Sequence, residues 1–333
     1  MACSHPGALL TLKRSRIFIL IDFYCAPRLP NLFIHTHTRA FMDAIYSMEN
    51  NKTKSMMSGS ARQFDPLNNF FFYKIFGEKG NEIQLLGFIN AVLGKTGDNK
   101  FVSVEILENK NFIAEIIGGK SCSLDVRARL KNGVMVNIEV QLRNQYNIDR
   151  RSLFYLSKEY TRDLESGEDY LKLPNVIAIN IVDYNFPNTR DFHSCFRLRE
   201  DTEKDIILTD ALEIHFINMV KYRKQGKDRL DEPLCRWLAW FNKNSTPEIL
   251  EEVVSMDTAI QNADKRMSNL TMSEEEMDTY YRMQKAEWDR VSALNYACRN
   301  RDRTIARNLL TEGLSHELIQ KTTGLSLEEI AKL

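Results

Sequence analysis

A predicted β-hairpin at residues 123–143, SLDVRARLKNGVMVNIEVQLR, constrains the fold of this chain most strongly. Apolar and polar residues alternate in its first half, which is typical of a strand with one buried face. The apolar set is Leu124, Val126 and Ala128, and the polar set is Asp125, Arg127 and Arg129. Lys131-Asn132-Gly133 then predicts the turn, because Asn-Gly accepts the positive φ angles that a tight turn needs. VMVNIEVQL returns as the second strand.

The hairpin brings two carboxylates together. Pairing about the turn sets Asp125 nearly opposite Glu139, and cross-strand neighbours have Cβ atoms about 4.5–5.5 Å apart. Two like charges at that distance repel unless a cation lies between them, and Mg²⁺ is typically held by one or two carboxylates. Gln141 is two residues beyond Glu139 and points to the same face. The competing interpretation is a solvated strand surface on which Arg127 and Arg129 pair with these acids.

The flanking segments predict further strands and helices. Residues 77–94 and 149–166 favour helices that Gly94 and Gly167 end, and we expect Ile83, Leu86, Phe88 (or Ile89) and Leu93 on the apolar side of the first. Strands are expected at residues 101–112, 174–184 and 193–200, of which the second is buried on both faces and the third lies near an edge. From about Asp210 onward we expect only helices, including a long charged one at residues 274–310.

The last residues predict two short helices, 315–322 and 326–333, between Gly313, Gly324 and the end of the sequence. Ser315 and Ser326 are good N-caps, and Ser326 forms a capping box with Glu329. The Thr-Gly-Leu-Ser segment between the helices resembles the turn of a helix-turn-helix motif. The alternative is a helical hairpin used for packing or self-association. The preceding basic stretch, residues 298–307, is the better candidate for DNA phosphate contacts.

The order of these elements resembles the core of PD-(D/E)XK nucleases: a strand, a strand with Asp125, a strand with Glu139 and Gln141, a helix and a buried strand. Residues 64–94, 124–141 and 150–184 resemble the Rpn family of recombination-promoting nucleases and transposases, and the resemblance covers about residues 61–333. It implies an α/β fold with a restriction-endonuclease-like PD-(D/E)XK core, a mixed sheet flanked by helices, and an all-α C-terminal region.

The resemblance also implies a site. Asp125 and Glu139 would bind Mg²⁺, with Mn²⁺ or Ca²⁺ as substitutes, and Gln141 would stand where these nucleases usually carry a lysine. A neutral amide can orient water or phosphate but cannot supply charge. Asn69 stands where similar members often have aspartate, and Glu82 is a candidate substitute acid, with a solvated helix position as its alternative.

The implied reaction is metal-dependent hydrolysis of DNA phosphodiester bonds, linked to recombination or mobile elements. Arg150, Arg151 and Lys158 on the following helix are candidate phosphate contacts, or else an exposed polar stripe. A second hypothesis is a catalytically degenerate protein with a nuclease-like fold that binds DNA or self-associates. The amides of Asn69 and Gln141 favour that alternative.

Composition limits the partners. The 45 basic and 45 acidic side chains give a net charge of zero, so any DNA-binding surface must be local. The six cysteines show no CxxC pair, which favours free thiols in the cytoplasm. The sequence contains no apolar run of membrane-span length, and a homo-oligomer is compatible with it. His35 and His37 have a spacing that suits a metal but lie in a segment without other signals.

These patterns predict three regions. Residues 1–60 are a disordered extension or lie upstream of the true start codon, 61–210 form the nuclease domain, and 211–333 form a helical region that ends in the helix-turn-helix-like segment.

Overall fold

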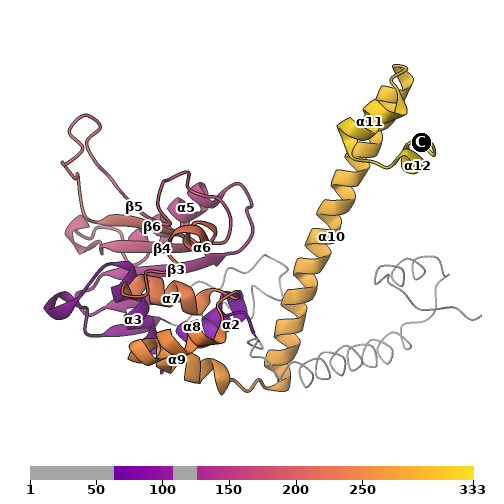
Figure 1. Ribbon diagram of the computed structural model, residues 1–333. Helices are drawn as coiled ribbons and strands as arrows, with labels where there is room; N and C mark the ends of the chain where they lie inside the picture. The colour runs from indigo at the N-terminus through magenta and orange to yellow at the C-terminus, as the bar shows by residue number, and fades with distance from the viewer. Residues whose placement is uncertain (1–63, 108–125) are drawn as a thin grey trace, which may run out of the picture. The chain divides into compact units, whose positions relative to one another are not determined.

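A six-stranded mixed sheet organises the protein (Figure 1). The computed structural model describes residues 64–107 and 126–333, so the expected N-terminal extension, His35, His37 and Asp125 lie outside the described residues. The strands are β1 (Val104–Leu107), β2 (Val126–Leu130), β3 (Met135–Gln141), β4 (Val176–Val182), β5 (His193–Arg197) and β6 (Leu212–Asn218). Their spatial order is β1-β2-β3-β4-β6-β5. This sheet, with helices on both faces, confirms the predicted fold class.

Strand β4 occupies the interior of the sheet. It pairs in parallel with both β3 and β6, and each of its seven residues is buried. Ile177, Ile179 and Ile181 face the main core, and Val176 and Ala178 face a smaller core on the other side. The nearly continuous apolar sequence of this strand follows from burial on both faces, as predicted.

The hairpin between β2 and β3 forms with the predicted facing of its side chains. Val126 pairs with Ile138, and the β2 residues alternate between buried and more exposed positions. The loop is one residue longer than a two-residue turn, because Leu130 N donates to Val134 O and only Gly133, with φ of 84°, takes the left-handed conformation. A three-residue loop with glycine in this conformation is a common hairpin connection.

One face of the sheet packs against a layer of helices. This layer comprises α2 (Asn69–Phe76), α3 (Glu82–Val92), α6 (Met219–Gln225), α7 (Pro233–Phe241), α8 (Pro247–Met256) and α9 (Thr258–Ser268). Leu85 and Phe88 of α3 are buried there, whereas Ile83 is 59% exposed. The apolar side predicted for this helix is therefore wrong at Ile83 and confirmed at Phe88, which packs against the buried Trp237 and Phe241 of α7.

The other face is covered by α5 (Ile148–Thr161), whose Leu156 packs with Met135, Val176 and Ala178 (Figure 1). Short 3₁₀ helices η1 and η2 span Gly97–Asn99 and Tyr170–Lys172.

The expectation of a purely helical chain beyond Asp210 is wrong. β6 is an interior strand, paired with β4 on one side and β5 on the other. Its sequence LEIHFIN alternates polar and apolar residues, which is a strand pattern. The sheet thus continues past the division predicted at residue 210.

The C-terminal helices form at the predicted places, but the last one ends at Ile330 instead of residue 333. They are α10 (Glu274–Thr311), α11 (His316–Thr323) and α12 (Leu327–Ile330), and capping boxes begin α10 and α12. Gly324, with φ of 73°, ends α11 in the left-handed conformation that a side chain would disfavour. Ala306, Ile319, Leu325 and Ile330 are the buried residues of a separate small core.

Candidate active site

Glu139 and Gln141 lie on the face of β3 that points toward α5. Their neighbours Val136, Ile138 and Val140 alternate to the opposite face and join the main core. Glu139 is buried, with only 4% of its side chain exposed. Strand alternation therefore places a carboxylate and an amide side by side in an enclosed region.

Arg151 of α5 holds the Glu139 carboxylate. Its Nε donates to Glu139 Oε1 at 2.5 Å, and its guanidinium lies 5.1 Å from the centre of the Tyr155 ring. The next residue, Ser152, donates its hydroxyl to Asn180 Oδ1 at 2.8 Å. These two contacts position the first turns of α5 over β3 and β4.

Two buried polar atoms beside this pair lack a hydrogen-bond partner among the described residues. They are the Gln141 Oε1 and the Tyr184 hydroxyl. The other end of Gln141 is satisfied, because its Nε2 donates to the Arg143 carbonyl at 3.2 Å. Burial, followed by the charge of Glu139, raises the pKa of Tyr184 to about 12 against the opposing effect of Arg151. The phenol therefore stays neutral at physiological pH.

The donor atoms of this region fit a hard divalent cation. Glu139 and Gln141 offer oxygens on one face, and an unpartnered buried acceptor is what a bound cation or its water would satisfy. In the structure, Arg151 supplies the positive charge next to Glu139.

A second ion pair lies on the same face. Arg127 of β2 contacts Glu159 of α5 through Nε at 3.0 Å and a terminal nitrogen at 2.5 Å, and Arg162 donates to the same carboxylate. The competing interpretation of Arg127 as the partner of the hairpin acids is not what the described contacts show. Arg129 instead lies 3.7 Å from both Glu105 and Asp163.

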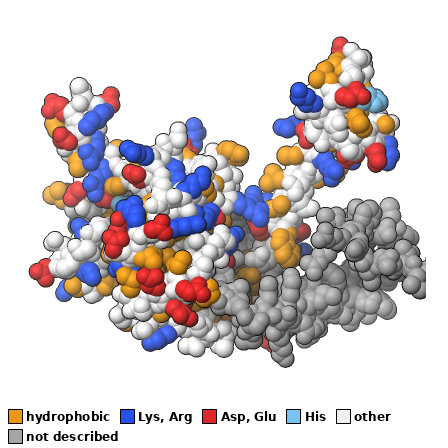
Figure 2. Space-filling view, viewed as in Figure 1, with side chains coloured by type: hydrophobic (Ala, Val, Ile, Leu, Met, Phe, Trp, Pro, Cys, Tyr) orange, Lys and Arg blue, Asp and Glu red, His pale blue; other side chains and the backbone are white. Residues whose placement is uncertain are grey.

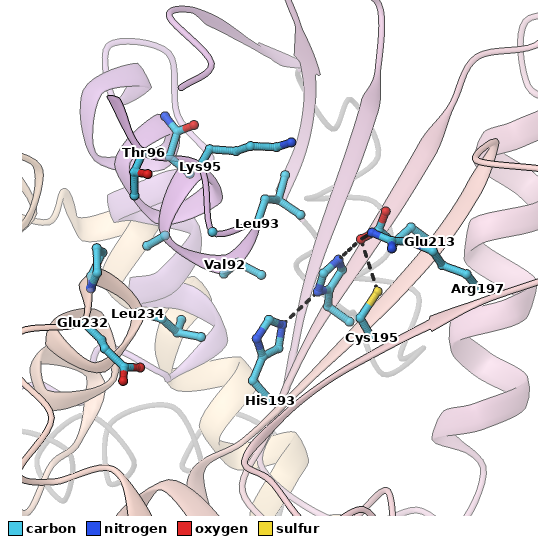
Figure 3. A pocket seen from close by; sticks show the side chains of 15 residues that line it. Val92, Leu93, Lys95, Thr96, His193, Cys195, Arg197, Glu213, Glu232 and Leu234 are labelled. Atoms are coloured by element: carbon cyan, nitrogen blue, oxygen red, sulfur yellow. Dashed lines mark hydrogen bonds and ion pairs between the residues drawn. The ribbon is translucent and has the colours of Figure 1, made fainter. Parts of the chain in front are cut away.

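A different cluster occupies the opposite face of the sheet, on β5 and β6 (Figure 3). Glu213 Oε1 lies 2.7 Å from His215 Nε2, and it accepts from the Cys195 thiol at 3.2 Å and from Arg197 at 2.7 Å. His193 Nε2 lies 2.9 Å from His215 Nδ1. Sequence analysis missed this cluster, although the alternation His-x-Cys-x-Arg and Glu-x-His on two paired strands was a usable signal.

The pKa values of this cluster follow from burial and hydrogen bonding. Burial and the adjacent His215 lower the pKa of His193 to about 4, so this imidazole is neutral at physiological pH. Burial and the contact with Glu213 raise the pKa of Cys195 to about 12. Burial opposes ionisation of Glu213, but hydrogen bonds from His215 and Arg197 outweigh it and bring the pKa to about 2.

A cavity of about 410 Å³ adjoins the second cluster. Residues 90–96, at the end of α3 and just after it, form a second wall of the cavity. Residues 232–234, at the start of α7, form a third. His215 is almost fully buried, with 3% of its surface exposed.

The charged side chains on the visible face are mixed in sign (Figure 2). Basic and acidic groups alternate over the sheet and its helices, in keeping with the net charge of zero. This view therefore does not single out a DNA-binding surface.

Comparison with known proteins identifies the family. The family model of the PD-(D/E)XK nuclease family transposase matches residues 66–297, which is more than half of the chain. The chain belongs to this family. A second family model, the C-terminal helix-turn-helix domain of the Rpn/YhgA-like nuclease family, matches residues 299–333. A search of curated proteins and a search of solved structures each return no match.

Membership in the PD-(D/E)XK nuclease family transposases confirms the resemblance to the Rpn family. The first match extends through β6 and most of α10, beyond the division predicted at residue 210. The second match begins inside α10 and includes α11 and α12, which favours the helix-turn-helix interpretation over a packing hairpin. Of the helices in the described ranges, none has the length and apolar character needed to cross a membrane.

The remaining candidate residues of this PD-(D/E)XK protein have defined positions. Asn69 is the first residue of α2, and Glu82 accepts from Gly80 N at 3.1 Å at the start of α3. Arg150 and Lys158 are exposed on α5, whereas Arg151 is committed to Glu139. Roles for these residues in metal or phosphate binding stay predictions.

Proposed function

We propose that this PD-(D/E)XK family protein is a Mg²⁺-dependent DNA endonuclease associated with recombination or mobile elements. The observation that supports it most is that buried Glu139 and Gln141 lie on one strand face, and that Gln141 Oε1 has no hydrogen-bond partner within residues 64–107 and 126–333. Family membership gives this pair its expected chemistry, and the C-terminal helix-turn-helix match favours DNA as the partner.

Asp125 completes the proposed site. It lies outside the described residues, but the pairing of Val126 with Ile138 would set Asp125 opposite Glu139 if it continued by one residue. The two carboxylates would then hold Mg²⁺, or Mn²⁺ or Ca²⁺ in its place. A bound divalent cation would lower the pKa of its water and neutralise charge that develops on the phosphate.

The side chains around the site have separate tasks in this proposal. Gln141 orients the attacking water, which donates a hydrogen bond to its Oε1, an acceptor without a partner among the described residues. It cannot act as a charged group. Arg151 compensates the charge of Glu139 before substrate binds, and its guanidinium then becomes available to a DNA phosphate, for which its planar donors are suited. Arg150 and Lys158 extend the same helix surface toward the DNA backbone.

The test is cleavage of supercoiled plasmid by the full-length protein with Mg²⁺ and with EDTA. We expect cleavage by the wild type with Mg²⁺, and loss of at least about 100-fold in Asp125→Ala and in Glu139→Gln. Glu159→Gln is the matched control, because its side chain is 5% exposed and also pairs with an arginine at 2.5 Å. It should keep cleavage within a few-fold once melting curves show that it is folded.

Each other outcome has a defined meaning. Cleavage retained in both Asp125→Ala and Glu139→Gln would reject the site. DNA binding by the wild type without cleavage in any divalent cation would reject the enzyme and favour the degenerate DNA-binding protein. Cytoplasmic localisation and self-association stay predictions, which fractionation and light scattering would check.

A further inference from the structure

The β5–β6 cluster carries chemistry that the nuclease proposal does not use. Cys195 and His215 are directly paired across the two strands, and Glu213 lies two residues before His215 on the same face. Three different ligating groups therefore project from one face of two adjacent strands (Figure 3). A thiol, an imidazole and a carboxylate together are the ligand types that bind Zn²⁺.

The donor atoms are close enough for one ion. Cys195 Sγ, a Glu213 oxygen and a His215 nitrogen all lie within 4.8 Å of one another. A tetrahedral Zn²⁺ with standard bond lengths separates such donors by about 3.3–3.6 Å. The Sγ to Oε1 distance of 3.2 Å is already near that range, and the Nε2 to Oε1 distance of 2.7 Å needs to open by about 0.6 Å.

The imidazole of His215 is oriented by a contact with His193 through its other ring nitrogen. His193 Nε2 contacts the Nδ1 of His215, which leaves the Nε2 of His215 directed at Glu213. Histidines that bind metals almost always have such a partner on the other ring nitrogen. In the metal-bound form, the His215 proton would lie on Nδ1 and be donated to His193.

We propose that Cys195, Glu213 and His215 form a binding site for a transition-metal cation of the Zn²⁺ class. Binding releases the thiol proton, so that a thiolate, a carboxylate and a neutral imidazole ligate the ion without any redox step. All three residues line the cavity of about 410 Å³. A fourth coordination position can therefore face that cavity and take water or a small ligand, as in sites with three protein ligands.

Arg197 is the competing cation. Its guanidinium donates to Glu213 at 2.7 Å, and its side chain is 35% exposed, so it can turn toward solvent when the ion binds. This position gives a direct test. Arg197→Gln should bind the metal more tightly than the wild type, because the carboxylate loses its competitor.

The main experiment titrates Co²⁺ into the chelator-treated, full-length protein and follows the thiolate-to-cobalt charge-transfer band. We expect a band that saturates near one Co²⁺ per chain and disappears on addition of Zn²⁺. Cys195→Ser should lack the band, and Cys298→Ser, which removes another exposed cysteine, should keep it. The cysteines at positions 3, 25 and 122 are present in both variants and cannot cause the difference.

Two further measurements keep the proposal testable if a variant folds poorly. Zn²⁺ should protect Cys195 of the wild type from alkylation, as read by peptide mass spectrometry, and should leave Cys298 reactive. His193→Ala should weaken Co²⁺ binding about 10- to 100-fold while it retains the band. Absence of the band and of protection in the wild type, or a band that persists in Cys195→Ser, overturns the site. Neither result bears on plasmid cleavage, which depends on the opposite face of the sheet.

Discussion

The buried carboxylate of Glu139 and the partly buried carboxylate of Glu213 lie on opposite faces of one sheet and have different neighbours. Glu139 has a guanidinium, an amide and a phenol around it, so the acceptors in its surroundings are oxygens. Glu213 has a thiol and two imidazoles in addition to Arg197. Strand alternation decides which face each acid occupies, and the neighbouring side chains decide whether a hard or a borderline cation suits it.

The largest effect is expected when Arg151, the partner of Glu139, is removed. Arg151→Met leaves the buried Glu139 carboxylate without its partner, which we expect to lower the free energy of unfolding by about 3 kcal/mol. Millimolar Mg²⁺ should recover part of that loss, because the cation can take the place of the guanidinium. Thermal and urea unfolding with Mg²⁺ and with EDTA would measure both effects.

Arg127→Met is the matched control for that experiment, since Arg127 pairs with the equally buried Glu159. We expect it to lose less stability, because Arg162 still contacts this carboxylate, and to gain nothing from Mg²⁺. Equal recovery of both variants by Mg²⁺ would mean that the Glu139 region has no special affinity for the ion.

An intermediate loss of stability is expected when Glu213 is substituted. Glu213→Gln weakens three hydrogen bonds to a charged acceptor and should lower stability by about 2 kcal/mol. Plasmid cleavage should stay within about twofold of the wild type, since the residue lies on the other face. Glu232→Gln serves as the control: it lines the same cavity but forms a surface pair with Arg229, so its stability should change by less than about 1 kcal/mol.

The smallest effect on stability is expected at Gln141, where stability and cleavage should change in opposite directions. Gln141→Leu removes a buried acceptor that has no hydrogen-bond partner in the described ranges. It also removes the donor to the Arg143 carbonyl, but Arg143 is exposed and water can replace that bond, so we expect stability to rise by about 1 kcal/mol. Cleavage should fall at least about tenfold, because the leucine cannot orient water. Gln84→Leu is the comparison, since Gln84 is similarly buried but satisfied by Ile75 O and Asn81 Oδ1, and it should lose stability. A loss of stability in both variants would remove the argument for a ligand at Gln141.

Sequence reasoning was most successful where one local pattern fixes the structure. The alternation around Gly133 predicted the hairpin and the shared face of Glu139 and Gln141. Capping residues predicted the starts of both short C-terminal helices, α11 and α12. In each of these cases the deciding contact lies within a few residues along the chain.

Sequence reasoning failed where contacts between residues far apart in the sequence determine the structure. β6 was missed because its alternation is short and lies next to long helical segments, although pairing with β4 and β5 makes it a strand. The Glu139–Arg151 contact depends on how α5 crosses β3. The Cys195–His215 pair depends on the register of two strands that residues 198–211 connect. Alternation within a strand shows which residues share a face, but spacing in the sequence does not show which residues of different elements meet.

The doubly paired strand β4 has a consequence for how the protein opens. Its amides bond in parallel to both β3 and β6, and its side chains are buried on both faces, whereas β5 pairs on one side only and is largely exposed. Hydrogen exchange should therefore be slowest in β4 and faster in β5. An ion bound between β5 and β6 would slow exchange at that edge, while an ion at Glu139 would leave the edge unchanged, so deuterium uptake would report which of the two acids has bound a metal.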